Sequence, residues 1–164
     1  MIKKILPLFA LCILVSVNAS AQKKKKSTVP RDSITNKFAY HHVSDSIMAS
    51  KAQLADRLDK WIAQNYNTDD KNTAVEIDGD TYMIHGRDQM QGASRRFIEY
   101  DLTVDLKENK YRYKMTDFQY IVSGRYALED KRATDKKRDL EEIDGMMRKI
   151  LNSLDAHMKK GDDW

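Results

Sequence analysis

An apolar residue occupies every second position from Ile98 to Leu106, and polar residues fill the positions between them. This alternation is typical of a β-strand that buries one face and exposes the other. A turn at 107–110 separates it from a second alternating segment, 111–116, and Asn109 in that turn tolerates left-handed backbone. The pattern predicts an antiparallel hairpin, which constrains the fold more than any other feature of the chain.

One register of this hairpin pairs opposite charges on the solvated face and apolar side chains on the buried face. Pairing Leu106 with Tyr111 places Asp105 opposite Arg112 on the solvated face. A shift by one residue would send every side chain to the other face. The same register aligns two further pairs on the buried face, Val104 with Tyr113 and Leu102 with Met115.

Two segments carry apolar residues at helical spacing. The first begins at a capping box in which Gln53 can reach back to the Ser50 amide. The second contains Gly145, which we expect to mark a close packing contact because glycine is costly inside a helix. The first stripe comprises Leu54, Leu58, Trp61, Ile62 and Tyr66, and the second Leu140, Ile143, Met147, Ile150, Leu151, Leu154 and Met158.

The remaining segments complete an α+β pattern. We expect a first strand at 37–43, a hairpin around Asp78-Gly79-Asp80, a loop at 86–92, a strand continuing through 118–122 and a polar stretch at 125–133. The predicted fold is a curved antiparallel sheet of about five strands, in β-α-β-β-β-β-α order, with two helices on one face. The 164-residue length suits one domain, which we place at 36–160, with a loose tail at 161–164.

The N-terminus has the pattern of a secretory signal peptide. Lys3 and Lys4 precede an apolar run from residue 5 to 15, and Ala19-Ser20-Ala21 is a small-x-small cleavage site. The run is shorter than the roughly 20 residues of a membrane-spanning helix, although an uncleaved signal anchor is the competing interpretation. We therefore predict a signal peptide at 1–21 and an exported protein, periplasmic or secreted. Cys12, the single cysteine, lies within the segment to be removed.

Most of the positive charge lies before the domain. The chain has a net charge of +4, but residues 1–35 hold seven of its 29 basic residues and one of its 25 acidic ones, so 36–164 carry −2. Residues 22–35 are expected to form a basic flexible leader, whose Lys23, Lys24, Lys25 and Lys26 either touch anionic envelope lipid or act as a spacer. The domain's own charge argues against nucleic acid as a partner.

Two runs of residues resemble one family of exported bacterial proteins. They are residues 50–54 leading into 61–66 (WIAQNY), and residues 104–113, which show a V-x-x-K-x-x-K-Y-R-Y pattern. The chain is similar over about 36–125 to the domain of unknown function 4468 family, whose members resemble the TATA-box-binding-protein fold. The resemblance implies a curved antiparallel sheet backed by two helices. It implies no activity and no functional residue.

Motifs of catalysis and cofactor binding are absent from the sequence. There is no H-E-x-x-H, EF-hand, G-x-S-x-G, P-loop or dinucleotide motif, and we expect no metal and no cofactor. Adjacent His41 and His42 should point to opposite faces of a strand. The acidic pairs Asp78/Asp80 and Asp101/Asp105 are better explained as solvating an exposed sheet. The alternating tyrosines and cations at 111–114 are better explained as a core stripe than as a nucleic-acid platform.

The solvated face of the sheet is the remaining candidate site. We predict a non-enzymatic exported domain that binds a protein, peptide or small ligand there, with an envelope protein or peptide as the expected partner. The alternative is an envelope-associated structural protein held at anionic lipid by Lys23–Lys26. The predicted binding residues are Phe97, Glu99, Asp101, Asp105, Arg112 and Lys114, beside Thr103 and Thr116.

Overall fold

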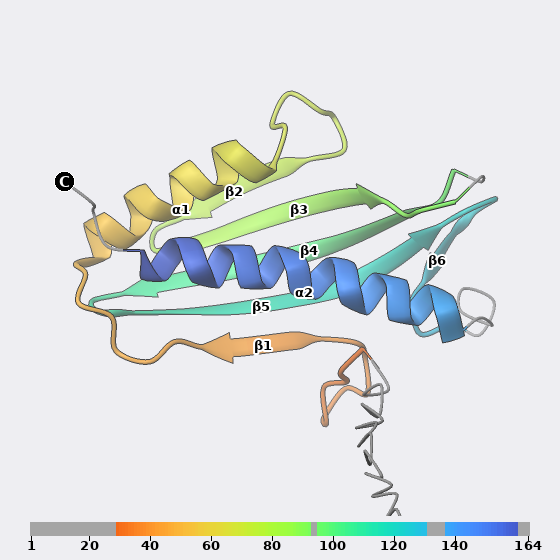
Figure 1. The fold of residues 1–164 in the computed structure, drawn as a ribbon, viewed down its shortest axis with the longest axis horizontal. Coiled ribbons are helices and arrows are strands. Elements are labelled where there is room, and N and C mark those ends of the chain that lie inside the picture. The colour runs from red at the N-terminus through yellow and green to blue at the C-terminus, as the bar shows by residue number, and fades with distance from the viewer. Residues whose placement is uncertain (1–28, 93–94, 131–136, 161–164) are drawn as a thin grey trace, which may run out of the picture.

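The computed structural model describes residues 29–92, 95–130 and 137–160. Within them six strands form one antiparallel sheet, and two helices lie across one of its faces (Figure 1). The predicted α+β class, antiparallel sheet and pair of helices are confirmed. The elements are β1 (Tyr40–Val43), α1 (Lys51–Asn65), β2 (Ala74–Asp78), β3 (Thr81–Gln89), β4 (Phe97–Lys107), β5 (Lys110–Ile121), β6 (Arg125–Ala127) and α2 (Lys137–Lys159).

The strand order is β1-β5-β4-β3-β2, and β6 also pairs with β5. β1 pairs with residues 112–115 and β6 with residues 119–121, so both lie along the same edge of β5. β6 is one strand more than we expected, and it lies in the stretch 125–133 predicted to be only polar. Its three residues are too few to show alternation, and a tight turn, in which the Val122 N–H donates to the Gly124 carbonyl at 3.0 Å, returns them to β5.

The predicted central hairpin is confirmed in its exact pairing. Leu106 lies opposite Tyr111 and Asp105 opposite Arg112. The Arg112 Nε donates to Asp105 Oδ2 at 2.6 Å. Asn109 takes φ 59°, the left-handed conformation expected in this turn. The two further apolar pairs are also formed as predicted.

A β-bulge in β5 keeps its apolar residues on the helix side. Asp117 and Phe118 together face the single residue Tyr100, and Asp117 takes φ 54°. Before the bulge the odd-numbered Met115 is buried, and after it the even-numbered Phe118 and Tyr120 are buried. The extra residue therefore corrects the phase of the strand, which otherwise would turn these two rings to the opposite face.

The first helix begins as its sequence predicts. The Gln53 N–H donates to Ser50 Oγ at 3.2 Å, and the Ser50 N–H donates to Gln53 Oε1 at 2.8 Å. Both halves of the capping box are present, so two N–H groups that lack partners within the helix are satisfied.

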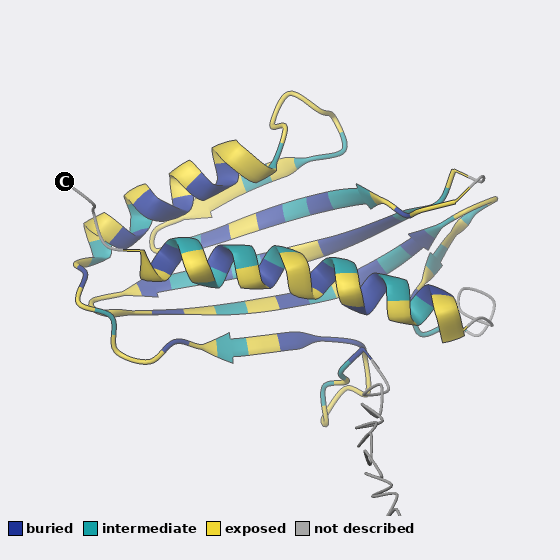
Figure 2. Ribbon diagram, in the orientation of Figure 1, coloured by how far each residue is buried: buried dark blue, intermediate teal, exposed yellow. Residues whose placement is uncertain are grey.

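The core lies between the helices and the sheet, where the buried stripes of α1 and α2 face the strands (Figure 2). Arg57, which is 7% exposed, donates from Nη1 to the Met158 carbonyl at 3.0 Å and so links α1 to the end of α2. The buried helical residues of the core are Leu54, Leu58, Trp61, Ile62, Ile143, Met147, Leu151, Leu154 and Met158.

The predicted loop at 86–92 is wrong at its start, because β3 continues to Gln89. Gly86 lies inside the strand, opposite Tyr100. A Cβ at Gly86 would lie 2.5 Å from Tyr100 Cζ, so glycine is required here for the phenol ring to cross the backbone. Glycine thus marks a close approach within a strand rather than a loop.

The expectation for Gly145 is also wrong. This residue is exposed on α2, and a Cβ added there would meet nothing within 4 Å. It therefore marks no packing contact, and its cost to the helix is not compensated by close packing.

Residues 29–35 belong to the domain, so the leader boundary expected at residue 35 is wrong. Val29 is 5% exposed and joins the core. The Ala39 N–H donates to the Pro30 carbonyl at 3.0 Å, and the Asp32 N–H donates to the Lys37 carbonyl at 2.8 Å. The signal peptide, residues 22–28 with Lys23–Lys26, and the tail at 161–164 lie outside the described residues.

Candidate functional site

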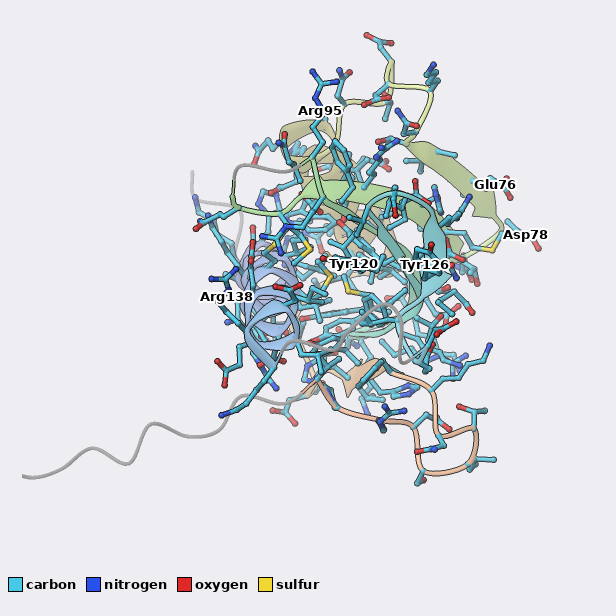
Figure 3. All side chains as sticks on the ribbon, turned by 90° about the vertical axis from the view of Figure 1, so that its right-hand side faces the viewer. Glu76, Asp78, Arg95, Tyr120, Tyr126 and Arg138 are labelled. Carbon is cyan, nitrogen blue, oxygen red and sulfur yellow. The ribbon has the colours of Figure 1, made fainter. Side chains whose placement is uncertain are left out.

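The sheet has one face without a helix, which we call the outer face. It carries the odd-numbered side chains of β3 and β4 and, by register, the even-numbered ones of β2. Figure 3 shows Glu76 and Asp78 of β2 on the side of the sheet away from α2 and its Arg138. All six predicted binding residues lie on this face. Whether they bind a partner stays a prediction.

Asp105 is held at the centre of a cross-strand network. Thr81 Oγ1 on β3 donates to Asp105 Oδ1 at 2.6 Å, and Arg112 on β5 donates to the other oxygen. The hydrogen bond from Thr81 and the ion pair with Arg112 lower the pKa of the Asp105 carboxyl, against an opposing effect of partial burial. The charges of Asp105 and Arg112 are therefore largely satisfied within the sheet.

The two other predicted acids on β4 also have partners. Asp101 Oδ1 lies 2.7 Å from His85 Nδ1 on β3. Glu99 Oε2 lies 2.8 Å from Arg125 Nη2 on β6, and Glu99 Oε1 lies 3.9 Å from Arg87 Nη1. These arginines leave Glu99 only 6% exposed. The Glu99 carboxylate, predicted as a binding group on the solvated face, is therefore buried beneath two arginines.

Phe97 is likewise less open than predicted. The Arg87 guanidinium carbon lies 4.1 Å from the centre of its ring, a cation–π distance, and Phe97 is only partly exposed. Phe97 therefore lies on the predicted face, but the Arg87 side chain covers part of its ring. Arg87 comes from the neighbouring strand β3, so no local pattern around Phe97 could show this cover.

Thr103 lines two hollows on the outer face. One, of about 540 Å³, lies toward β1 and includes His41, Arg112 and Lys114. The other, of about 300 Å³, lies toward β2 and includes Glu76 and Met83. Register places Glu76, Met83, Thr103, Lys114 and His41 in one row across five strands. We define these five residues as the transverse row.

The sequence prediction missed three members of the transverse row, His41, Glu76 and Met83. Met83 is 42% exposed, and its strand alternation with buried Tyr82 and Ile84 is a signal that could have found it. Glu76 and His41 join the row only through strand pairing, which a single segment does not specify.

The histidines lie as predicted on opposite faces of β1. His41 Nε2 lies 3.4 Å from Asp32, and His42 Nε2 lies 3.3 Å from Asp155 of α2. In the part of the chain that the structure describes, no three histidine, cysteine or acidic residues gather as a metal site would require. Tyr111 is 2% exposed, as expected for a core stripe.

No helix among residues 29–92, 95–130 and 137–160 is both long enough and apolar enough to cross a membrane.

An antiparallel sheet with two helices on one face and the other face open places this chain in the TBP-like class of α+β folds. A family model described as "Domain of unknown function (DUF4468) with TBP-like fold" matches residues 40–121, half of the chain. The chain belongs to this family, as the resemblance implied. The family description carries no activity.

Two solved structures share the fold. A TBP-like protein from Parabacteroides distasonis has a TM-score of 0.71 at 13% identity, covering 82% of this chain and 99% of its own. A DUF4468 family protein from Bacteroides ovatus has a TM-score of 0.64 at 14% identity, covering 83% of this chain and 93% of its own. No curated protein matches the chain.

Proposed function

We propose that this protein is an exported, non-enzymatic binding domain that takes an extended polypeptide segment along the transverse row. The observation that carries the proposal is the meeting of two hollows at Thr103, with a cation on one side and a carboxylate on the other. Concave sites with a few placed polar groups are the usual form of binding sites.

Glu76 and Lys114, two exposed charged residues of the transverse row, can both pair with a partner. Among the described residues, neither Lys114 nor Glu76 has an ion-pair partner, whereas Asp101, Asp105 and Glu99 all do. Charges that are unpaired in the free protein can pair with a partner without first breaking an internal contact. A segment with an acidic group near Lys114 and a basic group near Glu76 would match this row.

Exposed apolar surface beside these charges supports a polypeptide rather than a small ion. Met83 is 42% exposed and Val43, which lines the larger hollow, is 66% exposed. Methionine is flexible and suits surfaces that adapt to a partner. A segment crossing from β1 to β2 would cover both side chains.

Selection from a random peptide library on the immobilised protein tests the proposal. Selected peptides should bind the wild-type chain and lose about tenfold or more in affinity to Lys114→Glu, because charge reversal places like charges together. Arg138→Glu, which makes the same change on the helix side, is the matched control and should bind normally. Equal binding by Lys114→Glu and wild type would refute use of the transverse row.

Export is part of the proposal and rests on the pattern of residues 3–21. Expression of the full chain in a bacterial host, followed by intact-mass measurement of the exported fraction, should give a chain that begins at Gln22. A full-length chain confined to the cytoplasm would contradict export without bearing on the outer face.

A further inference from the structure

A pocket of about 420 Å³ is lined by residues from the end of α1, from β3 and β4, and from the middle of α2. Figure 1 shows α1 and α2 on the same side of the sheet. The volume of the pocket is within the range of about 300–1,000 Å³ for small-ligand sites. It is separate from the transverse row, which lies on the other face. Its lining includes the polar residues Asn65, Tyr66, Asp88, Tyr100, Lys149 and Ser153.

A chain of hydroxyl groups ends inside this pocket. Tyr100 Oη donates to Asp88 Oδ2 at 2.8 Å, and the two oxygens of Tyr100 and Tyr66 lie 3.2 Å apart. Because Tyr100 has already given its single proton to Asp88, Tyr66 must donate to Tyr100. Burial raises the pKa of both phenols, so both stay protonated. The lone pairs of the Tyr66 oxygen and Asp88 Oδ1 remain as acceptors.

Gly86 in β3 makes room for the Tyr100 hydroxyl group, which is hydrogen-bonded to that of Tyr66. Gly86 lets the Tyr100 ring cross the strand, since a Cβ there would lie 2.7 Å from the Tyr100 hydroxyl oxygen. The hydroxyl thereby reaches Asp88, two residues further along β3. Glycine weakens the interior of a strand, but here it lets the Tyr100 hydroxyl reach the Asp88 carboxylate.

The other polar side chains each keep one hydrogen-bonding function for a ligand. Asn65 Nδ2 donates to the Trp61 carbonyl at 2.9 Å, which leaves Asn65 Oδ1 as an acceptor. Ser153 Oγ accepts from Trp61 Nε1 at 3.2 Å, which leaves the Ser153 proton to donate. Lys149 is exposed and has no ion pair among the described residues. Together with Tyr66 and Asp88, these side chains offer three acceptors and two donor groups.

The charge and the walls of the pocket restrict the ligand further. Arg87 and Lys149 balance Asp70 and Asp88, so the lining as a whole is neutral. Met146 and Ile150 of α2 add an apolar wall. A neutral lining with interleaved donors and acceptors favours a ligand whose hydroxyls can do both, and whose C–H surface can pack on aliphatic groups.

We infer that this pocket is a binding site for a neutral saccharide, with hydroxyls donating to Asn65 Oδ1, Asp88 Oδ1 and the Tyr66 oxygen and accepting from Ser153 and Lys149. The inference does not depend on the transverse row, because the two sites lie on opposite faces of the sheet.

Titration of the ¹⁵N-labelled protein with glucose, N-acetylglucosamine, cellobiose and chitobiose tests the inference. At least one probe should shift the backbone amides of Tyr66, Asp88 and Ser153 in a saturable manner. Tyr66→Phe should weaken that binding about five- to tenfold, since it removes one acceptor and the end of the hydroxyl chain.

Tyr126→Phe is the matched control, because it removes a phenol on β6, outside the pocket, and should bind as wild type. A glucuronate titration separates the neutral from the anionic ligand class, and tighter binding of glucuronate than of glucose would overturn the neutral assignment. Absence of saturable shifts at the pocket with all four neutral probes would overturn the inference, as would unchanged binding in a folded Tyr66→Phe variant.

Discussion

Gly86 and Gly145 have opposite steric surroundings, and the same substitution should change stability in opposite directions. Gly145→Ala should raise the free energy of unfolding by about 0.5–1 kcal/mol, because it removes the entropic cost of glycine from an exposed helical position. Gly86→Ala should lower it by roughly 1–3 kcal/mol, because the new Cβ would overlap the Tyr100 ring. Urea unfolding monitored by circular dichroism measures both. A stabilised Gly86→Ala would contradict the packing described for Tyr100.

At the scale of single elements, the bulge in β5 decides which residues enter the core. Deletion of Asp117 should turn Phe118 and Tyr120 to the outer face, and we expect this variant to lose cooperative unfolding. Asp117→Gly keeps the extra residue and suits the φ of 54°, so its stability should stay within about 1 kcal/mol of wild type. Thermal unfolding compares the two. Cooperative unfolding of the deletion variant would show that the bulge does not set the phase.

The pairing of β3, β4 and β5 at Asp105 should contribute to the acid sensitivity of the domain. The hydrogen bond from Thr81 and the ion pair with Arg112 lower the pKa of Asp105 in the folded state, so the unfolded chain binds the proton more readily. The resulting stability is present above about pH 4 and is lost as the pH falls through the folded pKa.

The unfolding free energy of Asp105→Asn should therefore fall less steeply than that of wild type below about pH 4. The difference between the two proteins should be less than about 1 kcal/mol, because solvent screens the Asp105–Arg112 pair. Urea titrations at several pH values measure this slope. Thr81→Val is the control that keeps the carboxyl and removes one hydrogen bond, and NMR titration should then show a higher pKa for Asp105. An unchanged slope in Asp105→Asn would exclude this contribution.

At the scale of the whole molecule, the features that sequence reasoning found are those that neighbouring residues determine. The alternation and the Asp105/Arg112 charges specify one hairpin register, and Ser50 with Gln53 marks the start of α1. Contacts between distant segments were missed. Glu99 is covered by Arg125 from a strand of three residues, and this cover depends on the edge of β5 being extended.

The candidate sites also combine features set by neighbouring residues with contacts between distant segments. Alternation alone placed the six predicted side chains on the outer face, but not the partners that neutralise most of them. The transverse row arises from the order of five strands, and the saccharide pocket from a tyrosine of β4 that crosses β3 at Gly86. Neither has a local sequence signal, because strand order and ring packing are properties of the assembled sheet.

The boundary of the domain gives a last prediction for the molecule as a whole. Val29 is buried in the core at 5% exposure, whereas Ile34 in the same segment is 92% exposed. Val29→Ala in the full chain should lower the free energy of unfolding by about 1–2 kcal/mol, since two buried methyl groups are lost. Ile34→Ala removes more apolar volume at an exposed position and should stay within about 0.5 kcal/mol of wild type.

Urea unfolding of both variants, with an unchanged dependence on denaturant, provides the measurement. If Val29→Ala and Ile34→Ala behave alike, the segment before β1 contributes nothing to the core and the domain begins at Phe38 or later. If they differ as expected, the residues that pair Pro30 with Ala39 are part of the folding unit, and any shortened form intended for binding studies must begin no later than Val29.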